Sequence, residues 1–178
     1  MEEIYIFDID GCVLPPIFSN FIGKHSSREK LVVDIEKNGY KIPLFPEFLT
    51  FYEKKCKNAR SVIFITGRKE NEFGNLTQSQ LKPLEHIKSY KVIYYPEEKE
   101  HRAQEYYDWK VDQINKILKA EIEKKKFDIN QNSNLKVKIY DDMVKYFPRL
   151  KKKAKLLELE LELFKIKGKK SWIPLLKN

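Results

Sequence analysis

The hydrophobic positions of the chain gather into short runs, and five of these runs have the pattern of β-strands. The first four are short and rich in β-branched and aromatic residues, which is typical of strands in the centre of a sheet. In the fifth, Leu and Glu alternate strictly, which predicts a strand exposed on one face. The expected strands are residues 3–8 (EIYIFD), 61–66 (SVIFIT), 90–95 (YKVIYY), 136–140 (KVKIY) and 157–163 (LELELEL).

Helical spacing of apolar residues fills most of the segments between these strands. The clearest helix is predicted over residues 104–125, where Tyr107, Val111, Ile114 and Leu118 recur at intervals of three and four. Further helices are predicted over residues 27–37, 46–57, 77–89 and 143–153. Residues 169–178 contain Trp172 and are expected to form a docked C-terminal extension.

Alternation of strands with helices predicts an α/β, Rossmann-like fold, with a mainly parallel sheet and helices on both faces. The fully apolar early strands suit the centre of the sheet, and the Leu/Glu strand suits an edge. Right-handed crossovers then allow the strand order 3-2-1-4-5. We expect one domain over residues 1–168, in which residues 12–45 form a flap or small cap, followed by the extension 169–178.

Composition limits the class of protein further. The 178 residues are 42% hydrophobic and 13% aromatic, which excludes wholesale disorder. No apolar run approaches the roughly 20 residues that cross a bilayer, and the N-terminal sequence MEEI lacks a basic region and an apolar signal core. Two cysteines, Cys12 and Cys56, cannot build a disulfide framework. We therefore expect a cytoplasmic protein with no membrane partner.

Carboxylates follow two strands that the expected order makes neighbours. Asp8 and Asp10 follow the first strand, and Asp141 and Asp142 follow the fourth. In such sheets ligands bind beyond the carboxyl ends of the strands, where four converging carboxylates would repel one another unless a cation such as Mg²⁺ neutralised them. Thr66-Gly67, after the second strand, offers a hydroxyl and a backbone amide to phosphate oxygens. Each motif alone is commonly a turn or a cap, but their joint placement favours a site.

These residues resemble the motifs of the haloacid dehalogenase (HAD) superfamily of phosphohydrolases. The first motif is similar to residues 7–14 (FDIDGCVL), the second to 64–68 (FITGR) and the fourth to 139–142 (IYDD), and the resemblance spans roughly residues 4–165. Cys12 departs from the usual Thr or Val and is interpreted as a small buried residue. The third motif is a single Lys, for which Lys110 is the first candidate and Lys91 and Lys99 are weaker ones.

The resemblance implies a mechanism and a role for each residue. Asp8 would be the nucleophile that forms an aspartyl-phosphate, and Asp10 the acid and then the base. Asp8, the backbone carbonyl of Asp10, Asp141 and Asp142 would hold Mg²⁺. Lys110 would balance charge on the nucleophile and the phosphoryl group. Arg68 would either contact substrate or form a structural ion pair. The phosphoryl oxygens would be bound by Gly11, Thr66 and Gly67.

Within the superfamily, the motifs look most like the polynucleotide-phosphatase and RNA-repair-associated branch. About 35 residues separate Gly11 from Pro46 and about 40 separate Arg68 from Lys110, which leaves no room for a large cap domain. An open site admits a nucleic-acid end or a phosphoprotein. Net charge is +9, and residues 144–178 hold ten Lys and one Arg against three Glu, or +8. This concentrated basic charge favours nucleic acid, with a separate RNA- or DNA-repair enzyme as a conceivable partner.

Two alternatives remain open from the sequence. The chain could be a phosphatase of small molecules such as nucleotides or sugar phosphates. It could instead be a non-catalytic nucleic-acid-binding module that uses its basic C-terminal region. A fused kinase half is excluded, because no glycine loop of the form Gly-x4-Gly-Lys-Ser/Thr is present. Aromatic residues near the expected site would either stack on bases or belong to the core; they are Tyr94, Tyr95, Tyr106, Tyr107 and Trp109.

Overall fold

Five parallel strands form one sheet in the computed structural model, which describes residues 2–16, 28–100, 102–127, 135–157 and 159–177. The order is β3-β2-β1-β4-β5, and every adjacent pair is parallel. The predicted α/β class and strand order are therefore confirmed. The strands are β1 (Glu2–Phe7), β2 (Ser61–Ile65), β3 (Lys91–Ile93), β4 (Leu135–Asp141) and β5 (Glu160–Lys165).

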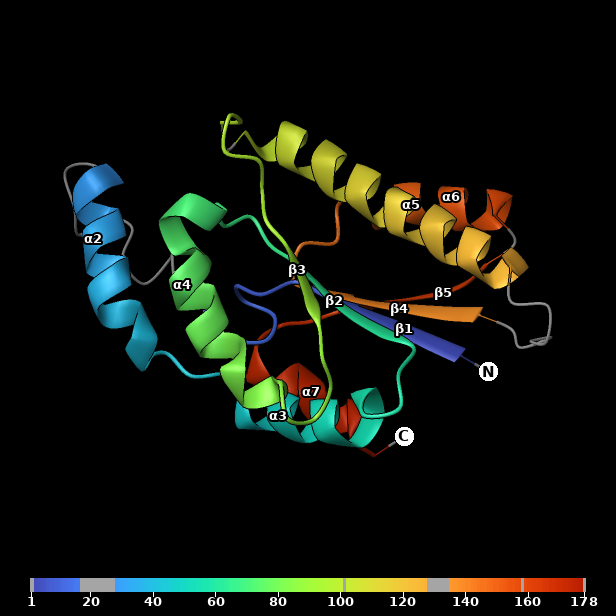
Figure 1. The fold of residues 1–178 in the computed structure, drawn as a ribbon, viewed down its shortest axis with the longest axis horizontal. Helices are drawn as coiled ribbons and strands as arrows, with labels where there is room; N and C mark the ends of the chain where they lie inside the picture. Colours follow the sequence, from blue (N-terminus) through green and yellow to red (C-terminus); the bar gives the residue numbers. More distant parts are fainter. Residues whose placement is uncertain (1, 17–27, 101, 128–134, 158, 178) are drawn as a thin grey trace.

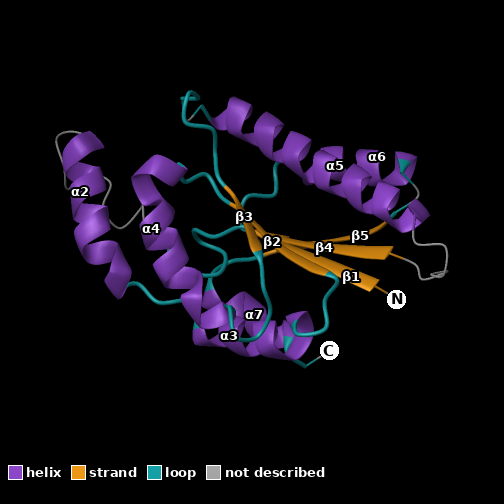
Figure 2. Ribbon diagram, in the orientation of Figure 1, coloured by secondary structure: helices purple, strands orange, loops and turns teal. Residues whose placement is uncertain are grey.

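Helices cover both faces of this sheet (Figures 1 and 2). On one face lie α5 (Ala103–Phe127) and α6 (Phe147–Leu156), side by side. On the other face lie α3 (Pro46–Phe51), which continues as η2 (Tyr52–Cys56), and the short α7 (Trp172–Leu175). The remaining helices, α2 (Arg28–Asn38) and α4 (Glu70–Leu81), pack together to one side of the sheet. None of the helices among the described residues has the length and apolar character needed to span a membrane.

Two apolar cores, one on each face, explain why the central strands are apolar without interruption. Side chains alternate along a strand, so Tyr5 and Phe7 enter the core under α3, whereas Ile4 and Ile6 enter the core under α5. Over these four residues neither face of β1 meets water, since all four side chains are at most 1% exposed. Because β1 is buried on both faces here, the residue that follows it, Asp8, is held at the carboxyl end of the central strand with little freedom to move.

The helix predicted over residues 77–89 is wrong in its bounds, because α4 runs from Glu70 to Leu81. Pro83 lacks an N–H donor and its ring obstructs the preceding helical turn, so the chain passes into the 3₁₀ turn η3 (Lys82–Leu84). The start lies earlier because Glu70 and Glu72 place negative charge in the first turn, where the helix dipole favours it.

The last strand also differs from its prediction. The run of residues 157–163 was expected to form it, but α6 continues to Leu156 and β5 begins at Glu160, while Glu158 lies outside the described residues. The edge position is as expected. Lys136 of β4 pairs with Glu160 at 2.8 Å and Glu162 at 2.7 Å, so the exposed acidic face of β5 is neutralised across the strands.

The C-terminal extension docks on this chain through Trp172. Its indole is fully buried, its Nε1 donates a hydrogen bond to the Cys12 carbonyl at 3.0 Å, and its ring lies 5.0 Å from the rings of Phe48 and Phe51. The extension therefore completes the core under α3. It also supports the backbone of the Asp8–Leu14 segment, because the carbonyl that accepts the indole proton belongs to that segment.

Replacing Trp172 by Ala should lower the free energy of unfolding by about 3–5 kcal/mol, because the truncation leaves a large cavity among aromatic rings. Urea denaturation followed by circular dichroism measures this effect. The neighbouring Ile173, which is 44% exposed, provides the control Ile173→Ala. Equal stabilities of the two variants would show that the docked extension contributes nothing to the core.

The insert between Gly11 and Pro46 was predicted to be a flap or small cap, and its residues 17–27 lie outside the described part. The described part consists of residues 12–16, α2, η1 (Gly39–Lys41) and the link to α3. Gly39 lets η1 approach α4 closely, since a Cβ there would lie 2.9 Å from Leu76 Cδ2. The insert is thus packed on α4, the helix that follows β2.

Candidate functional site

The residues at the carboxyl ends of β1, β2 and β4 lie next to one another because these strands are adjacent. Backbone hydrogen bonds fix two of these residues at the strand ends: the Asp8 N–H donates to Tyr140 O at 2.9 Å and the Thr66 N–H to Ile93 O at 3.0 Å. Asp8, Thr66 and Asp141 are all at most 6% exposed. The geometry that sequence analysis expected from the strand order is present.

Three carboxylates form a group with the spacing of a metal site. Asp8, Asp141 and Asp142 each offer one oxygen, and these oxygens all lie within 4.8 Å of one another. Oxygen ligands of this type, two of them buried, fit a hard divalent cation such as Mg²⁺. Among the described residues, the side chain of Asp10 does not belong to this group. The ligand expected from Asp10 is its backbone carbonyl, and that assignment stays a prediction.

Lys110 supplies a positive charge in the middle of this group. Its Nζ lies 2.7 Å from Asp8 Oδ1 and 2.5 Å from Asp141 Oδ2, and the side chain is 2% exposed. The residue reaches the site because it sits in the second turn of α5. Lys91, by contrast, is exposed at the start of β3, the opposite end from the carboxyl ends of the strands, and Lys99 is exposed in a loop. Of the three candidate lysines, Lys110 is therefore the one that contacts the predicted nucleophile.

The electrostatics of the site show an excess of negative charge over positive. Burial raises the pKa of the Asp8 carboxyl well above its usual range; Lys110 offsets part of this, and Asp141 and Asp142 add to it. Burial and the neighbouring Asp141 raise the pKa of Asp142 to about 6. Burial lowers the pKa of Lys110, but Asp141 and Asp8 outweigh this and hold that pKa well above its usual range. A divalent cation at the three carboxylates would remove the imbalance.

A pH dependence of stability follows for the protein without divalent cations. The folded-state pKa of Asp142, about 6, is above the ordinary value of 3.8. Its contribution to the free energy of unfolding is therefore complete below pH 3.8 and is lost as the pH rises through 6. In urea denaturation with EDTA, the free energy of unfolding should therefore fall less over this range in Asp142→Asn than in wild type. Mg²⁺ should restore the loss in wild type at pH 7. Identical pH profiles for the two proteins would contradict this.

Tyr146 belongs to the site, although sequence analysis did not find it. Its hydroxyl donates to Asp141 Oδ2, while the Met143 N–H donates to Asp141 Oδ1 at 2.7 Å. Each Asp141 oxygen thus accepts a hydrogen bond from within the chain, which fixes the orientation of the carboxylate. Tyr106 and Tyr146 also place their rings 5.3 and 5.6 Å from Lys110 Nζ, so the ammonium group is held between two aromatic faces.

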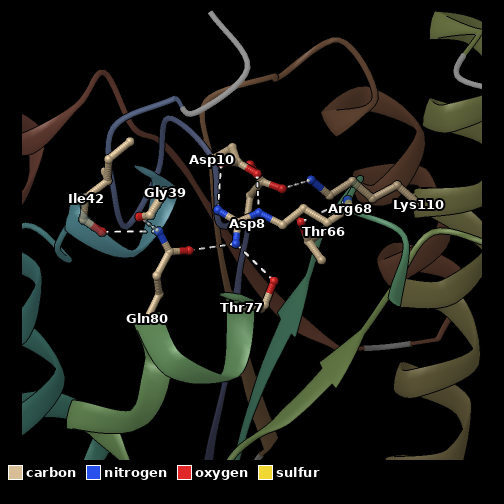
Figure 3. A network of polar contacts seen from close by, with 9 residues as sticks. All are labelled: Asp8, Asp10, Gly39, Ile42, Thr66, Arg68, Thr77, Gln80 and Lys110. Carbon is tan, nitrogen blue, oxygen red and sulfur yellow. Dashed lines mark hydrogen bonds and ion pairs between the residues drawn. The ribbon is translucent and has the colours of Figure 1, made fainter. Parts of the chain in front are cut away.

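Arg68 forms an ion pair with Asp10. Its Nε donates to Asp10 Oδ2 at 2.8 Å and its Nη2 donates to Asp10 Oδ1 at 2.9 Å, a bidentate arrangement (Figure 3). Nη1 donates to Thr77 Oγ1 at 2.9 Å and to Gln80 Oε1 at 2.7 Å. Sequence analysis left two roles open for Arg68, substrate contact and structural ion pair. The structure favours the second, since the guanidinium is buried among these partners.

Two glycines of the predicted phosphate-binding set are closely packed, and at Gly11 the backbone conformation also favours glycine. Gly11 has a φ of +78°, and a Cβ there would lie 2.6 Å from Asp142 Oδ2. A Cβ on Gly67 would lie 3.3 Å from the ring of Tyr106. The hydroxyl oxygen of Thr66 accepts a hydrogen bond from the Arg68 N–H at 3.2 Å, which shapes the turn after β2. Their contacts to a phosphoryl group stay predictions.

Cys12 and most of the nearby aromatic residues have structural roles. Cys12 is fully buried, its Sγ donates to Tyr140 O at 3.4 Å, and burial raises the pKa of its thiol well above the usual range, so it is inert. Tyr95, Tyr106 and Trp109 are at most 8% exposed and pack in the core under α5. These three are therefore core residues that cannot stack on bases, whereas Tyr94 and Tyr107 are partly exposed.

Comparison with known proteins identifies the fold. No family model matches the chain, and a search of curated proteins finds no match. Two solved structures of the HAD domain of the effector protein Lem4 from Legionella pneumophila, one of them an inactive mutant, match with TM-scores of 0.52 and 0.53. Each alignment covers 99% of this chain and 92% of the other, at 14% identity. The chain has a HAD fold. At this identity the likeness extends to the fold alone. The strand order and the placement of the acidic residues are those that sequence analysis expected.

Proposed function

We propose that this HAD-fold chain is a Mg²⁺-dependent phosphomonoesterase that works through an aspartyl-phosphate and acts on terminal phosphates of nucleic acid. One observation carries the proposal: the buried Asp8 carboxylate is held by Lys110 within 4.8 Å of oxygens of Asp141 and Asp142. A structural cap or turn has no need of three carboxylates and a buried ammonium group around one point. A nucleophile that must approach an anionic phosphate does need them.

Two chemical steps follow from the residues. An oxygen of Asp8 attacks phosphorus, the bond from phosphorus to the leaving oxygen breaks, and Asp10 gives that oxygen a proton. Asp10 then takes a proton from water, whose oxygen attacks the phosphorus of the aspartyl-phosphate, so that inorganic phosphate leaves and Asp8 is restored. Throughout, Lys110 offsets negative charge on Asp8 and the phosphoryl group, while Thr66 and Gly67 bind phosphoryl oxygens.

The cation would be held by the carboxylates of Asp8, Asp141 and Asp142, with the backbone carbonyl of Asp10. When bound, it reduces the repulsion between the Asp8 carboxylate and an anionic substrate. The raised pKa values of Asp8 and Asp142 support this assignment, because burial and mutual repulsion make the full negative charge of the group costly without a cation.

Nucleic acid is the substrate class that the surface charge supports. The α6 helix begins five residues after Asp142, and it carries five exposed basic side chains: Arg149, Lys151, Lys152, Lys153 and Lys155. Such a concentration of positive charge attracts a polyanion. Because Tyr95, Tyr106 and Trp109 are in the core, recognition would rest on phosphates and sugars, and we expect weak base preference.

A charge-reversal experiment tests the substrate class. The variant Lys151→Glu/Lys152→Glu should raise KM about tenfold for a terminally phosphorylated oligonucleotide at low salt, and this difference should shrink at high salt. Turnover of p-nitrophenyl phosphate should stay within about twofold of wild type. The matched control is Lys54→Glu/Lys57→Glu, which makes the same charge change at exposed positions beside α3, on the other face of the sheet.

Other outcomes of this test select the alternatives. If nucleoside monophosphates are hydrolysed as fast as oligonucleotides and both charge variants behave alike, the enzyme is a small-molecule phosphatase. If oligonucleotides bind without Mg²⁺ and no phosphate is released from any compound, the chain is a binding module and the catalytic proposal fails.

A further inference from the structure

A polar network lies behind Asp10 and connects it to α4. Thr77 and Gln80, both on α4 and at most 6% exposed, accept hydrogen bonds from Nη1 of Arg68. Arg68 itself is 1% exposed, so its charge depends on these acceptors and on Asp10 for stabilisation. Figure 3 shows the guanidinium between Asp10 on one side and the two α4 side chains on the other. Neither Thr77 nor Gln80 is part of a motif that the sequence analysis identified.

The amide of Gln80 extends this network to the insert. Its Oε1 accepts from Arg68, while its Nε2 donates to the carbonyls of Gly39 at 3.0 Å and Ile42 at 3.2 Å (Figure 3). A flipped amide would place its NH₂ against the guanidinium and its oxygen against two carbonyls, so the partners determine one orientation. The position needs an acceptor at one end and a donor at the other, which a long amide side chain provides.

We propose that Gln80 is a positioning residue that acts through Arg68 to fix the orientation of Asp10, and that the other end of its amide holds the insert at Gly39–Ile42. The inference rests on the proposed role of Asp10 as the acid and base. Arg68 donates one hydrogen bond to each Asp10 oxygen and thereby fixes the plane of the carboxylate that transfers the proton. Gln80 in turn holds the guanidinium from the side opposite Asp10.

Loss of Gln80 has an effect on the first chemical step that depends on the leaving group. Without its oxygen, Nη1 of Arg68 keeps only Thr77 among the two α4 acceptors, and the guanidinium gains freedom to tilt together with Asp10. Proton transfer depends on a fixed geometry of the acid. The ratio kcat/KM reports the first step, in which the phosphoryl group is transferred to Asp8 and the leaving group departs. In that step a good leaving group departs without a proton and is insensitive to the tilt, whereas a poor leaving group needs the proton from Asp10.

The test compares Gln80→Met, which keeps side-chain length but has no polar group, with Gln78→Met at an exposed position of the same helix. The ratio kcat/KM for phosphate release is measured over a series of phosphomonoesters, from nitrophenyl to alkyl leaving groups. We expect Gln80→Met to lose less than about threefold with the best leaving group and at least about tenfold with the poorest, while Gln78→Met follows wild type throughout. A uniform loss across the series, or no loss, would overturn the positioning role.

A conservative variant separates the two ends of the amide. In Gln80→Glu one oxygen still accepts from Arg68, but an acceptor replaces the donor that faces Gly39 and Ile42. We expect the wild-type dependence on the leaving group together with faster amide hydrogen exchange over residues 39–42. The same selective loss as in Gln80→Met would overturn the route through Arg68, and unchanged exchange would show that the amide does not hold the insert.

A measurement that needs no activity distinguishes this inference from the proposed function. The Nε–H of Arg68, identified by its loss in Arg68→Lys, should exchange slowly with water in wild type and Gln78→Met, and faster in Gln80→Met. Equal exchange in all three proteins would overturn the positioning by Gln80 even if the wild type is an active phosphatase. Absence of phosphate release from wild type would instead remove the proposed function, whatever the exchange rates.

Discussion

Replacement of Asp8 by Asn is expected to abolish turnover, by about four orders of magnitude or more, because an amide cannot form the aspartyl-phosphate. The fold should be retained. Lys110 keeps its contact with Asp141, and the change removes a carboxylate whose pKa is raised by burial and by the neighbouring Asp141 and Asp142. The free energy of unfolding without divalent cations should therefore be unchanged or higher. Phosphate release and urea denaturation measure the two effects.

The exposed Asp112 on α5 provides the matched control Asp112→Asn, which should keep wild-type activity and stability. Phosphate release by Asp8→Asn at a rate near that of wild type would exclude the covalent mechanism. A large fall in stability would instead contradict the electrostatic description, since it would mean that the buried carboxylate is needed for the fold.

Replacement of Lys110 by Met is expected to have the second large effect, and on stability as well as activity. The substitution leaves Asp8 and Asp141 buried without their common ammonium partner, which should lower the free energy of unfolding in EDTA by about 3–5 kcal/mol. Activity should fall by about two to three orders of magnitude, the effect of removing one group that stabilises a transition-state charge. Mg²⁺ should restore part of the stability, since it binds the folded protein at the same carboxylates.

Lys116→Met, at an exposed position six residues further along α5, is the control for Lys110→Met. It should change stability and activity little. If both variants have the same stability in EDTA, Lys110 does not compensate the buried carboxylates. If Mg²⁺ stabilises neither wild type nor Lys110→Met, the three carboxylates do not form a cation site.

The sheet and the cluster around Asp8 could be predicted because both depend on local sequence signals. Buried strands are continuous apolar runs, and a polar residue at the end of such a run marks the sheet edge where ligands bind. Asp8 and Thr66 each follow a strand in this way, and Asp141 is the last residue of one. Lys110 could be assigned because helices begin at the same side of the sheet at which parallel strands end. A residue in an early turn of α5, the helix that follows β3, therefore lies near the strand ends.

The residues behind the site could not be predicted, because their roles depend on contacts between distant segments. Gln80 has no local signal of function, and the helix that contains it was placed seven residues too late at its N-terminus. The role of Arg68 stayed open in the sequence because the same side chain could have faced a substrate or a carboxylate. Tyr146 reads as an ordinary residue before a basic helix until its hydroxyl is seen to contact Asp141.

The docking of the C-terminal extension was likewise only partly predictable. An apolar segment with Trp172 after the last strand suggested docking, but the partner surface could not be chosen from sequence. It is the aromatic group of Phe48 and Phe51 under the sheet. These residues lie more than a hundred positions earlier in the chain, and no periodic pattern connects them with Trp172.

The measurement that tests the central claim most directly is inorganic phosphate release by the wild-type protein, with Mg²⁺ and with EDTA. The substrates are p-nitrophenyl phosphate, nucleoside monophosphates, and RNA and DNA oligonucleotides phosphorylated at the 3′ or the 5′ end. The proposed function predicts release that requires Mg²⁺ and is fastest from one type of oligonucleotide end. Equal release in EDTA, or no release from any of these compounds with Mg²⁺, would contradict it.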